Sequence, residues 1–401
     1  MKSSRSISEL FPDAGLFRGA AARPEHELLL LCAHRGNPPN VREQVVELSR
    51  SINDWNYLFQ LARRHALLPL LYQSVENVDG LPEDFRAKLR DEFRKNATRN
   101  TLLAGELVRL ARLFEAEGVA LLAYKGPALA RQAFGDIRLR RFVDLDVIVR
   151  RRDAGRAGGL LQSLGFTKPP GLTAAHEEFL LRRQHNLAYT RDGGLMIVEL
   201  HWEVAPARFA AAAVGEGVWG RAARVELFGT DVPCPSPEDL LLALAVHGTK
   251  HLWEKLAWVC DVAALVNSRP GFDWPYVQER AHEARVERML HLALRLARGL
   301  AGAKLPEGLA VATDDKVLTA LSEEVTAAMF SGAGPEPIGL IRNLRFNLRA
   351  RPGLKERLDY LRFVLTPTDG DLAAFRLPAG ISFAYYLLRP LRLVLKKEAG
   401  H

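Results

Sequence analysis

The sequence predicts an α+β fold, with a small mixed sheet between helical regions at the two ends of the chain. Apolar residues recur every three or four positions in residues 53–118 and 236–300, which is the period of an amphipathic helix. Short apolar or alternating runs, typical of strands, occupy the middle of the chain at residues 119–124, 144–149 and 194–204. Strands gathered in one compact block between helices favour a mixed sheet over a doubly wound parallel one.

We divide the chain into four parts on this basis. Residues 1–115 form an N-terminal helical region, 116–235 the α/β core, 236–305 a helical domain that packs on the core, and 306–401 a basic C-terminal helical region. The boundary at 236 rests on Ser236, a good N-cap that is followed by proline and two acidic residues, so we expect a helix to begin there.

Positive charge is concentrated near the C-terminus. The chain has a formal net charge of +8, and residues 339–401 hold 12 Lys/Arg against 5 Asp/Glu, which gives +7. Because the rest of the chain is close to balanced, a broad nucleic-acid-binding surface is not indicated. The basic helix predicted at residues 382–397 has two interpretations: a contact with a membrane surface or a partner, or a packed terminal helix with a solvated basic rim. We favour the second.

Cysteine usage and hydropathy exclude several classes of protein. Cys32, Cys234 and Cys260 form no CxxC pair, which argues against a disulfide framework and a structural zinc site. Three scattered cysteines suit a reducing compartment, so we expect a cytoplasmic protein. No segment reaches about 18 uninterrupted apolar residues, so no membrane-spanning helix is predicted. The start of the chain lacks a long apolar stretch, so we expect no signal peptide.

Residues 121–149 carry the main chemical constellation of the chain. They read as a strand, a tight turn, a short crossover helix at 127–134, a basic loop and a second strand. Asp144 and Asp146 lie two apart in the second strand. Because side chains of a strand alternate between its two faces, both carboxylates project from the same face. Such a pair can hold a divalent metal, although in isolation the pattern is more often a solvated strand end.

Two neighbouring motifs strengthen this interpretation. The Lys125-Gly126 turn ends the first strand and begins the helix, where free N–H groups and a lysine could meet a phosphate. A later strand carries Glu199, with His201 on the same face. Two or three carboxylates on neighbouring strands can hold paired Mg²⁺ ions, which prefer oxygen ligands and complete their shells with water and substrate phosphates.

The joint pattern of these motifs resembles the polymerase-beta-like nucleotidyltransferase superfamily. It is more closely similar to a poorly characterised group of nucleotidyltransferase family proteins with an LKG…YGDPxLR…DxDLLV…VELHW pattern. The resemblance covers most of the chain from about residue 50. The departures are Phe134 in place of Tyr and Ile137-Arg138 inside the YGDPxLR element. Like its relatives, the chain has Lys-Gly where the broader superfamily has Gly-Gly or Gly-Ser, which leaves the phosphate contact of that turn open. The corresponding motifs are AYKG (123–126), FGDIRLR (134–140), DLDVIV (144–149) and VELHW (198–202).

The resemblance implies transfer of a nucleoside monophosphate from a nucleoside triphosphate to an acceptor, with Mg²⁺ or Mn²⁺ as cofactor. Asp144 and Asp146 would bind two metals, one activating the acceptor oxygen and one stabilising the leaving pyrophosphate. Glu199 would bind the activating metal or take the proton of the acceptor, and His201 is the alternative for this role. The residues expected at the phosphates of the nucleotide are Lys125, Gly126 and Arg140.

A pair of histidines on a predicted helix is the second place of interest. His247 and His251 lie four residues apart and share a helix face, although such a pair without a third ligand does not identify a metal site. The resemblance favours a functional role for these two histidines, because the matching helix of related transferases packs behind the active site. We interpret both histidines and Asp261 as cofactor-binding residues that face the substrate or lie directly behind it. The alternative is a packed or capping helix end.

The sequence does not specify the acceptor. We favour a small molecule, peptide or protein. An RNA acceptor, as in toxins that add nucleotides to transfer RNA, is the first alternative, but the balanced charge of the core argues against the large basic surface that tight RNA binding needs. Phosphoryl transfer on the same fold remains open. A non-catalytic scaffold is the last alternative, and the intact Asp144 and Asp146 pair argues against it.

Overall fold

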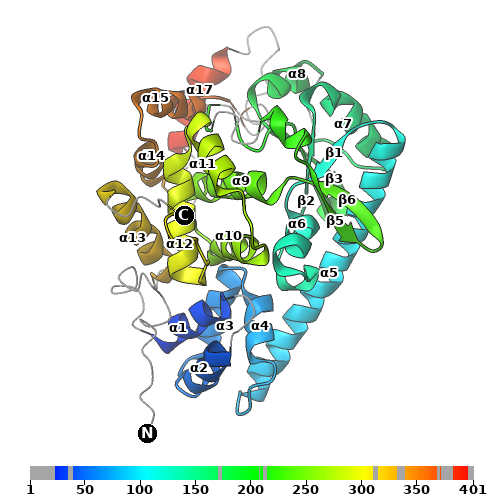
Figure 1. Cartoon of the computed structure of the whole chain (residues 1–401). Coiled ribbons are helices and arrows are strands. Elements are labelled where there is room, and N and C mark those ends of the chain that lie inside the picture. Colours follow the sequence, from blue (N-terminus) through cyan, green and yellow to red (C-terminus); the bar gives the residue numbers. More distant parts are fainter. Residues whose placement is uncertain are drawn as a thin grey trace.

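The structure of the chain is a computed structural model. Figure 1 shows the sheet on one side of the molecule and most helices from both ends of the chain on the other, with α9 and α10 between them. The architecture is therefore the predicted α+β fold, in which helical regions flank a small mixed sheet. The structure describes residues 23–34, 39–169, 174–206, 208–210, 215–309, 315–331, 339–367, 371 and 383–395.

The N-terminal part of the chain is helical, as predicted. Asp54 caps the third helix, because its carboxylate accepts a hydrogen bond from the backbone N–H of Tyr57. Gly118 follows the fifth helix with a φ of +66°, a conformation that glycine adopts without strain and that commonly ends helices. The helices are α1 (Pro24–Cys32), α2 (Pro39–Ser49), α3 (Trp55–Arg64), α4 (Leu68–Val75) and α5 (Glu83–Ala116).

The central sheet is mixed, as predicted, with the strand order β1-β2-β4-β3. The pair β2 and β4 is parallel, whereas β1 and β3 each run antiparallel to their neighbour. The predicted hairpin around Asp192–Gly194 connects β3 and β4. A separate hairpin of β5 (Ala223–Leu227) and β6 (Thr230–Cys234) follows. The strands of the sheet are β1 (Leu121–Ala123), β2 (Leu145–Val149), β3 (Asn186–Arg191) and β4 (Met196–His201).

The connection between β1 and β2 differs from the prediction in one respect. A helix is present at the expected place, as α6 (Gly126–Leu129) and a π-helical turn (Ala130–Phe134). The predicted crossover at 127–134 is nevertheless wrong, because a crossover joins parallel strands and β1 is antiparallel to β2. The turn at Lys125-Gly126 and the loop before Asp144 therefore meet at the same end of the sheet.

The register of β2 and β4 places the predicted acidic residues side by side. Asp146 is paired with Glu199, and Ile148 with His201. Asp144 lies just before β2 and not within it. Because a slip of one residue would turn each side chain to the opposite face, this register is what brings the two carboxylates to a common face.

The two faces of the sheet have different neighbours. Leu122 and Ile148 belong to one hydrophobic core with residues of α1–α4, α9, α10 and α12. Leu121 and Val147 point to a second core, which α5 and α7 (Ala154–Ser163) complete. Since Asp146 lies two residues before Ile148, its side chain shares the face that turns toward α9 and α10.

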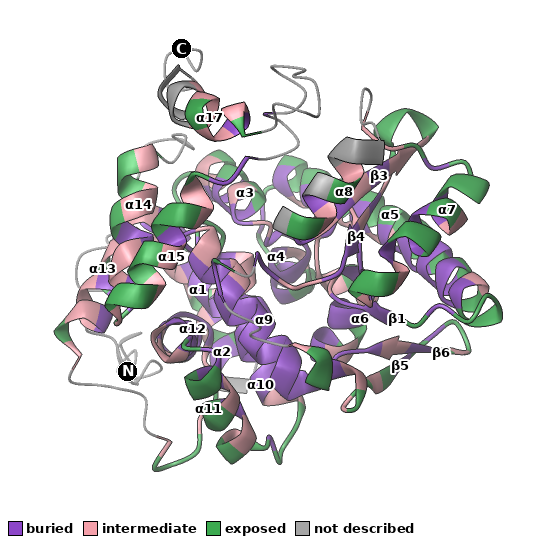
Figure 2. Cartoon of the chain, turned by 90° about the horizontal axis from the view of Figure 1, so that it is seen from above, coloured by how far each residue is buried: buried purple, intermediate pink, exposed green. Residues whose placement is uncertain are grey.

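The second half of the chain is helical. Ser236 caps α9, because its hydroxyl accepts a hydrogen bond from the backbone N–H of Asp239, and Pro237 occupies the first turn as predicted. Figure 2 shows α9 and α10 as mostly buried, so both have neighbours on nearly every side. Further helices are α8 (Ala174–Arg183), α9 (Pro237–Lys250), α10 (Leu256–Ser268), α11 (Trp274–Glu283), α12 (Glu287–Ala301) and α13 (Lys316–Phe330).

The C-terminal helices are α14 (Leu340–Arg349), α15 (Leu354–Val364) and α17 (Ala384–Leu395). Tyr385 of α17 is fully buried, and Arg389 and Arg392 form ion pairs with the buried Asp371. These contacts place one face of the basic helix against the protein, while contact of its outer face with a membrane or partner stays a prediction. The last two lysines of the predicted basic helix lie outside the described residues. No described helix is long and apolar enough to cross a membrane.

Candidate active site

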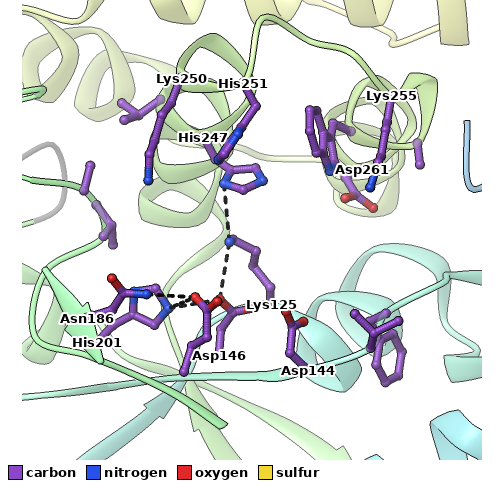
Figure 3. Close-up of a pocket in the computed structure, with 18 of the residues that line it drawn as sticks. Lys125, Asp144, Asp146, Asn186, His201, His247, Lys250, His251, Lys255 and Asp261 are labelled. Carbon is purple, nitrogen blue, oxygen red and sulfur yellow. Dashed lines mark hydrogen bonds and ion pairs between the residues drawn. The ribbon is translucent and has the colours of Figure 1, made fainter. Parts of the chain in front are cut away.

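A cavity of about 390 Å³ lies between the sheet and the helices α9 and α10, and it falls in the size range of small-molecule sites. Figure 3 shows its two sides facing each other. We call the sheet side the floor, with Lys125, Asp144, Asp146, His185, Asn186, Glu199 and His201. We call the helix side the roof, with His247, Lys250, His251, Lys255, Trp258 and Asp261.

The floor gathers a compact group of possible metal ligands. One ligand atom each from Asp146, Glu199 and His201 lies within 4.8 Å of the others. His201 Nε2 is 3.0 Å from Asp146 Oδ1 and 3.3 Å from Glu199 Oε2. Asn186 Nδ2 donates a hydrogen bond of 2.9 Å to the same oxygen of Glu199. The group contains Asp146 and Glu199 of the predicted set together with His201, and Asp144 lines the same cavity.

The floor carries more negative charge than its own lysine and histidine neutralise. Burial, followed by the charges of Asp146 and Glu199, raises the pKa of Asp144 to about 6. Burial also acts to raise the pKa of Asp146, but Lys125 and His201 outweigh it and hold this pKa well below its usual range. A divalent cation would supply the missing positive charge, so the donor set of carboxylates and one imidazole fits such an ion.

His201 is held between the two carboxylates. Burial acts to lower its pKa, but the hydrogen bonds to Asp146 and Glu199 outweigh burial and raise it. Its Nδ1 is buried and has no hydrogen-bond partner within the described part of the chain. The ring of Tyr124 packs edge-on against the imidazole, with 5.7 Å between the ring centroids. The position of His201 is therefore fixed by the acids on one side and an aromatic ring on the other.

Lys125 links the floor to the roof. Its Nζ lies 3.4 Å from Asp146 Oδ1 and 3.5 Å from His247 Nδ1. Burial acts to lower the pKa of Lys125, but the charges of Asp146, Tyr124, Glu199 and Asp144 together outweigh it and raise this pKa. Gly126 does not line the cavity. It has a φ of +47°, and a Cβ there would lie 3.4 Å from the backbone oxygen of Asp144, so glycine allows the turn to approach the strand.

Arg140 and Asp261 join the two sides of the cavity. Nε and Nη2 of Arg140 donate hydrogen bonds of 2.8 and 3.0 Å to the two carboxylate oxygens of Asp261. Both side chains are almost fully buried, so this is a strong bidentate pair. Asn100 of α5 holds the loop in place by donating to the backbone oxygen of Arg140. The two predicted residues are thus brought together, and Nη1 of Arg140 takes no part in the pair.

The roof is built around a cluster of rings. The rings of His247 and His251 lie 4.8 Å apart, and both contact the ring of Trp258. Burial, followed by the charge of Lys125, holds the pKa of His247 well below its usual range. Burial and the charge of Lys250 lower the pKa of His251 to about 3. Both histidines are therefore neutral near pH 7, and neither belongs to the metal-ligand group of the floor.

Sequence reasoning missed His185 and Asn186 and left Lys250 without a role. Asn186 could have been found, because the hairpin register pairs it directly with His201. His185 precedes it, and its Nε2 lies 3.4 Å from Nζ of Lys250. No local sequence signal links His185 to Lys250, since the two residues lie 65 positions apart and meet only where α9 packs on the sheet.

A family model described as an uncharacterised nucleotidyltransferase matches residues 51–302. The match covers more than half of the chain and includes every floor and roof residue. No curated protein matches the chain. The matched range contains the residues of the floor, so the family likeness and the geometry concern the same part of the chain. The chain belongs to the uncharacterised nucleotidyltransferase family.

Proposed function

We propose that this protein transfers a nucleoside monophosphate from a nucleoside triphosphate to a small-molecule, peptide or protein acceptor. The observation that carries the proposal is the group of Asp146, Glu199 and His201, with Asp144 beside it, on the floor of a cavity in a member of this family. A cytoplasmic location suits this function, because the three cysteines are free and nucleoside triphosphates are available there.

The floor is the proposed place of a divalent cation, Mg²⁺ or Mn²⁺. Asp144, Asp146 and Glu199 would hold it through oxygen atoms, which both ions accept as ligands. When bound, such a cation would supply Lewis-acid charge to a phosphoryl centre. Its binding would lower the pKa of Asp144 from about 6, because the charge that now opposes ionisation would be offset.

The remaining residues have proposed roles in binding and in proton transfer. Lys125 and Nη1 of Arg140, which takes no part in the pair with Asp261, would bind phosphate oxygens of the nucleotide. Glu199 would take the proton of the acceptor hydroxyl or hold the cation next to it, and its hydrogen bond from Asn186 would fix its orientation. His247 and His251, being neutral, would contact the nucleotide by hydrogen bonding or ring stacking and not by charge.

Transfer of label from ATP tests this proposal and separates it from its alternatives. The protein would be incubated with Mg²⁺, an acceptor pool and ATP labelled at either the α- or the γ-phosphate. We expect the α label to appear on an acceptor from a metabolite or peptide pool, and the γ label to leave as pyrophosphate. Transfer of the γ label would instead establish phosphoryl transfer, and preferential labelling of extracted RNA would establish an RNA acceptor.

The variant with Asp144→Ala and Asp146→Ala is the control for the site. We expect it to lose transfer, because both carboxylates proposed to hold the cation are removed. Unchanged transfer by this variant would refute the assignment of the floor. Thermal unfolding of the same variant would exclude a loss of fold as the cause.

A further inference from the structure

Lys250 and His185 form a pair of nitrogen bases at one end of the cavity. Lys250 is the last residue of α9, and its Nζ lies 3.4 Å from His185 Nε2. Figure 3 shows Lys250 reaching from the roof toward the floor on the side of Asn186 and His201, whereas Asp144 and Asp261 lie on the other side. The pair is therefore placed near Glu199, which Asn186 holds by a hydrogen bond.

The positive charge of Lys250 is not neutralised by a contact. No carboxylate of the described residues forms an ion pair with it, in contrast to Lys125, which contacts Asp146. His185 is buried and neutral, because burial and the charge of Lys250 hold its pKa well below its usual range. Burial and the charge of Lys125 lower the pKa of Lys250 to about 8. Holding a half-buried cation beside a neutral base costs free energy, which an anion in the cavity would offset.

Lys125 and Lys250 lie in different parts of the cavity. Lys125 and Arg140 lie with Asp144 and Asp146, where the proposed function places the nucleotide. Lys250 lies by Glu199, which the proposed function places at the acceptor hydroxyl; among the floor acids, Glu199 acts most strongly on the charge of Lys250. The nucleotide already has two cationic residues, so the further cation of Lys250 suits a second anionic group.

We propose that Lys250, positioned by His185, binds an anionic group of the acceptor, a carboxylate or a phosphate that lies close to the hydroxyl that is modified. This inference rests on the proposed function and adds a substrate class to it. In the transfer, the acceptor oxygen forms a bond to the α-phosphorus, and the bond from that phosphorus to the oxygen bridging to the β-phosphorus breaks. Pyrophosphate leaves with the electron pair, and the hydroxyl proton passes to Glu199. Lys250 fixes the acceptor and takes no part in these bonds.

Binding of simple anions to the nucleotide complex tests this assignment. Wild-type protein would be saturated with Mg²⁺ and α,β-methylene ATP, and then titrated with inorganic phosphate or with acetate by calorimetry. We expect one of the two anions to bind, and Lys250→Met to weaken that binding about tenfold or more, because a charge-assisted hydrogen bond is lost. The two anions distinguish a phosphate-bearing from a carboxylate-bearing acceptor. The affinity for the nucleotide analogue should change less than about twofold.

Two further variants and a folding check complete the test. Lys250→Arg keeps the charge and should keep anion affinity within about threefold. Lys255→Met removes a cation at the Trp258 side of the same cavity and should have a smaller effect than Lys250→Met. Circular dichroism would verify that each variant is folded.

Three results would overturn the inference. They are the absence of anion binding to the wild-type nucleotide complex, unchanged anion binding in Lys250→Met, and a loss of nucleotide affinity in that variant as large as its loss of anion affinity. The last result would assign Lys250 to the nucleotide. Failure of the wild-type protein to bind the analogue at all would instead overturn the proposed function, so the two failures are distinguishable.

Discussion

The floor and the roof of the cavity differ in how their residues come together. On the floor, Asp146, Glu199 and His201 are set by the register of two adjacent strands. On the roof, His247, Lys250 and Asp261 come from two helices whose position depends on packing across the whole molecule. The floor is rich in carboxylates, and the roof carries neutral imidazoles and lysines. Acidic groups that fit a cation and basic groups that fit an anion thus face each other across a space the size of a small ligand.

The largest effect is expected for Asp146→Asn on the floor. Asp146 contacts both Lys125 and His201, so its charge organises the site as well as holding the proposed cation. We expect the transfer rate at saturating substrate to fall by about 10³-fold or more. Initial rates of α-label transfer measure this. Asp231→Asn, an exposed acid of β6, is the matched control and should stay within about twofold; an equal loss in both variants would contradict the role of the floor.

Replacing Glu199 and His201 separately tells which of the two supports the acceptor. We expect Glu199→Gln to lower kcat by about 10²-fold, the effect of losing a general base or a cation ligand. His201→Gln should cost about tenfold, because His201 positions the two carboxylates without reacting. Steady-state kinetics on a common acceptor gives both values. The reverse order of effects would assign the third ligand to His201.

Breaking the pair between Arg140 and Asp261 tests the joint between floor and roof. Asp261→Leu leaves a buried guanidinium without its carboxylate, and we expect the free energy of unfolding to fall by about 3 kcal/mol. The double variant Arg140→Met with Asp261→Leu removes both charges and should recover most of that loss. Urea denaturation measures both. A double variant no more stable than Asp261→Leu would show that the pair is not the source of the cost.

The smallest effect concerns a histidine that anchors the roof. His65 Nδ1 accepts a hydrogen bond from the backbone N–H of Leu256, at the start of α10, and its Nε2 donates to the backbone oxygen of Met329. Burial, followed by the charge of Arg64, lowers the pKa of His65 to about 4 from an ordinary value near 6.5. The unfolded chain therefore takes up a proton first, and stability falls as the pH drops from about 6.5 toward 4.

His65→Gln removes this titration and keeps a hydrogen-bonding side chain. Between pH 7 and pH 5, we expect the wild type to lose about 1–2 kcal/mol more of its free energy of unfolding than the variant does. Urea denaturation at the two pH values gives the difference. The contributions of the other buried histidines are the same in both proteins and cancel in this difference. Equal losses in the two proteins would mean that folding does not lower the pKa of His65.

The same contrast explains what the sequence could predict. Alternation along single strands predicted a common face for Asp144 and Asp146, although Asp144 lies just before β2, and a common face for Glu199 and His201. The approach of Asp146 to Glu199 and His201 follows from the parallel pairing of β2 and β4, which no local pattern reveals. The antiparallel direction of β1 was missed for the same reason, since the short helix after it is compatible with either direction.

The contacts of the roof could not be predicted from the sequence, although several of its residues were identified as candidates. Arg140 and Asp261 are 121 positions apart, and their pairing requires α10 to dock beside the basic loop. The link of Lys250 to His185 depends likewise on the docking of α9. The sequence identifies such residues as chemically capable, but tertiary packing decides which of them meet.

Binding of a divalent cation to the floor is tested most directly by a titration of Mn²⁺ in the presence of α,β-methylene ATP. The affinity of wild-type protein and of Asp146→Asn would be compared by electron paramagnetic resonance of free Mn²⁺. We expect the variant to bind the ion at least about tenfold more weakly, because a carboxylate ligand becomes a neutral amide. Equal affinity in the two proteins would contradict a cation site on the floor.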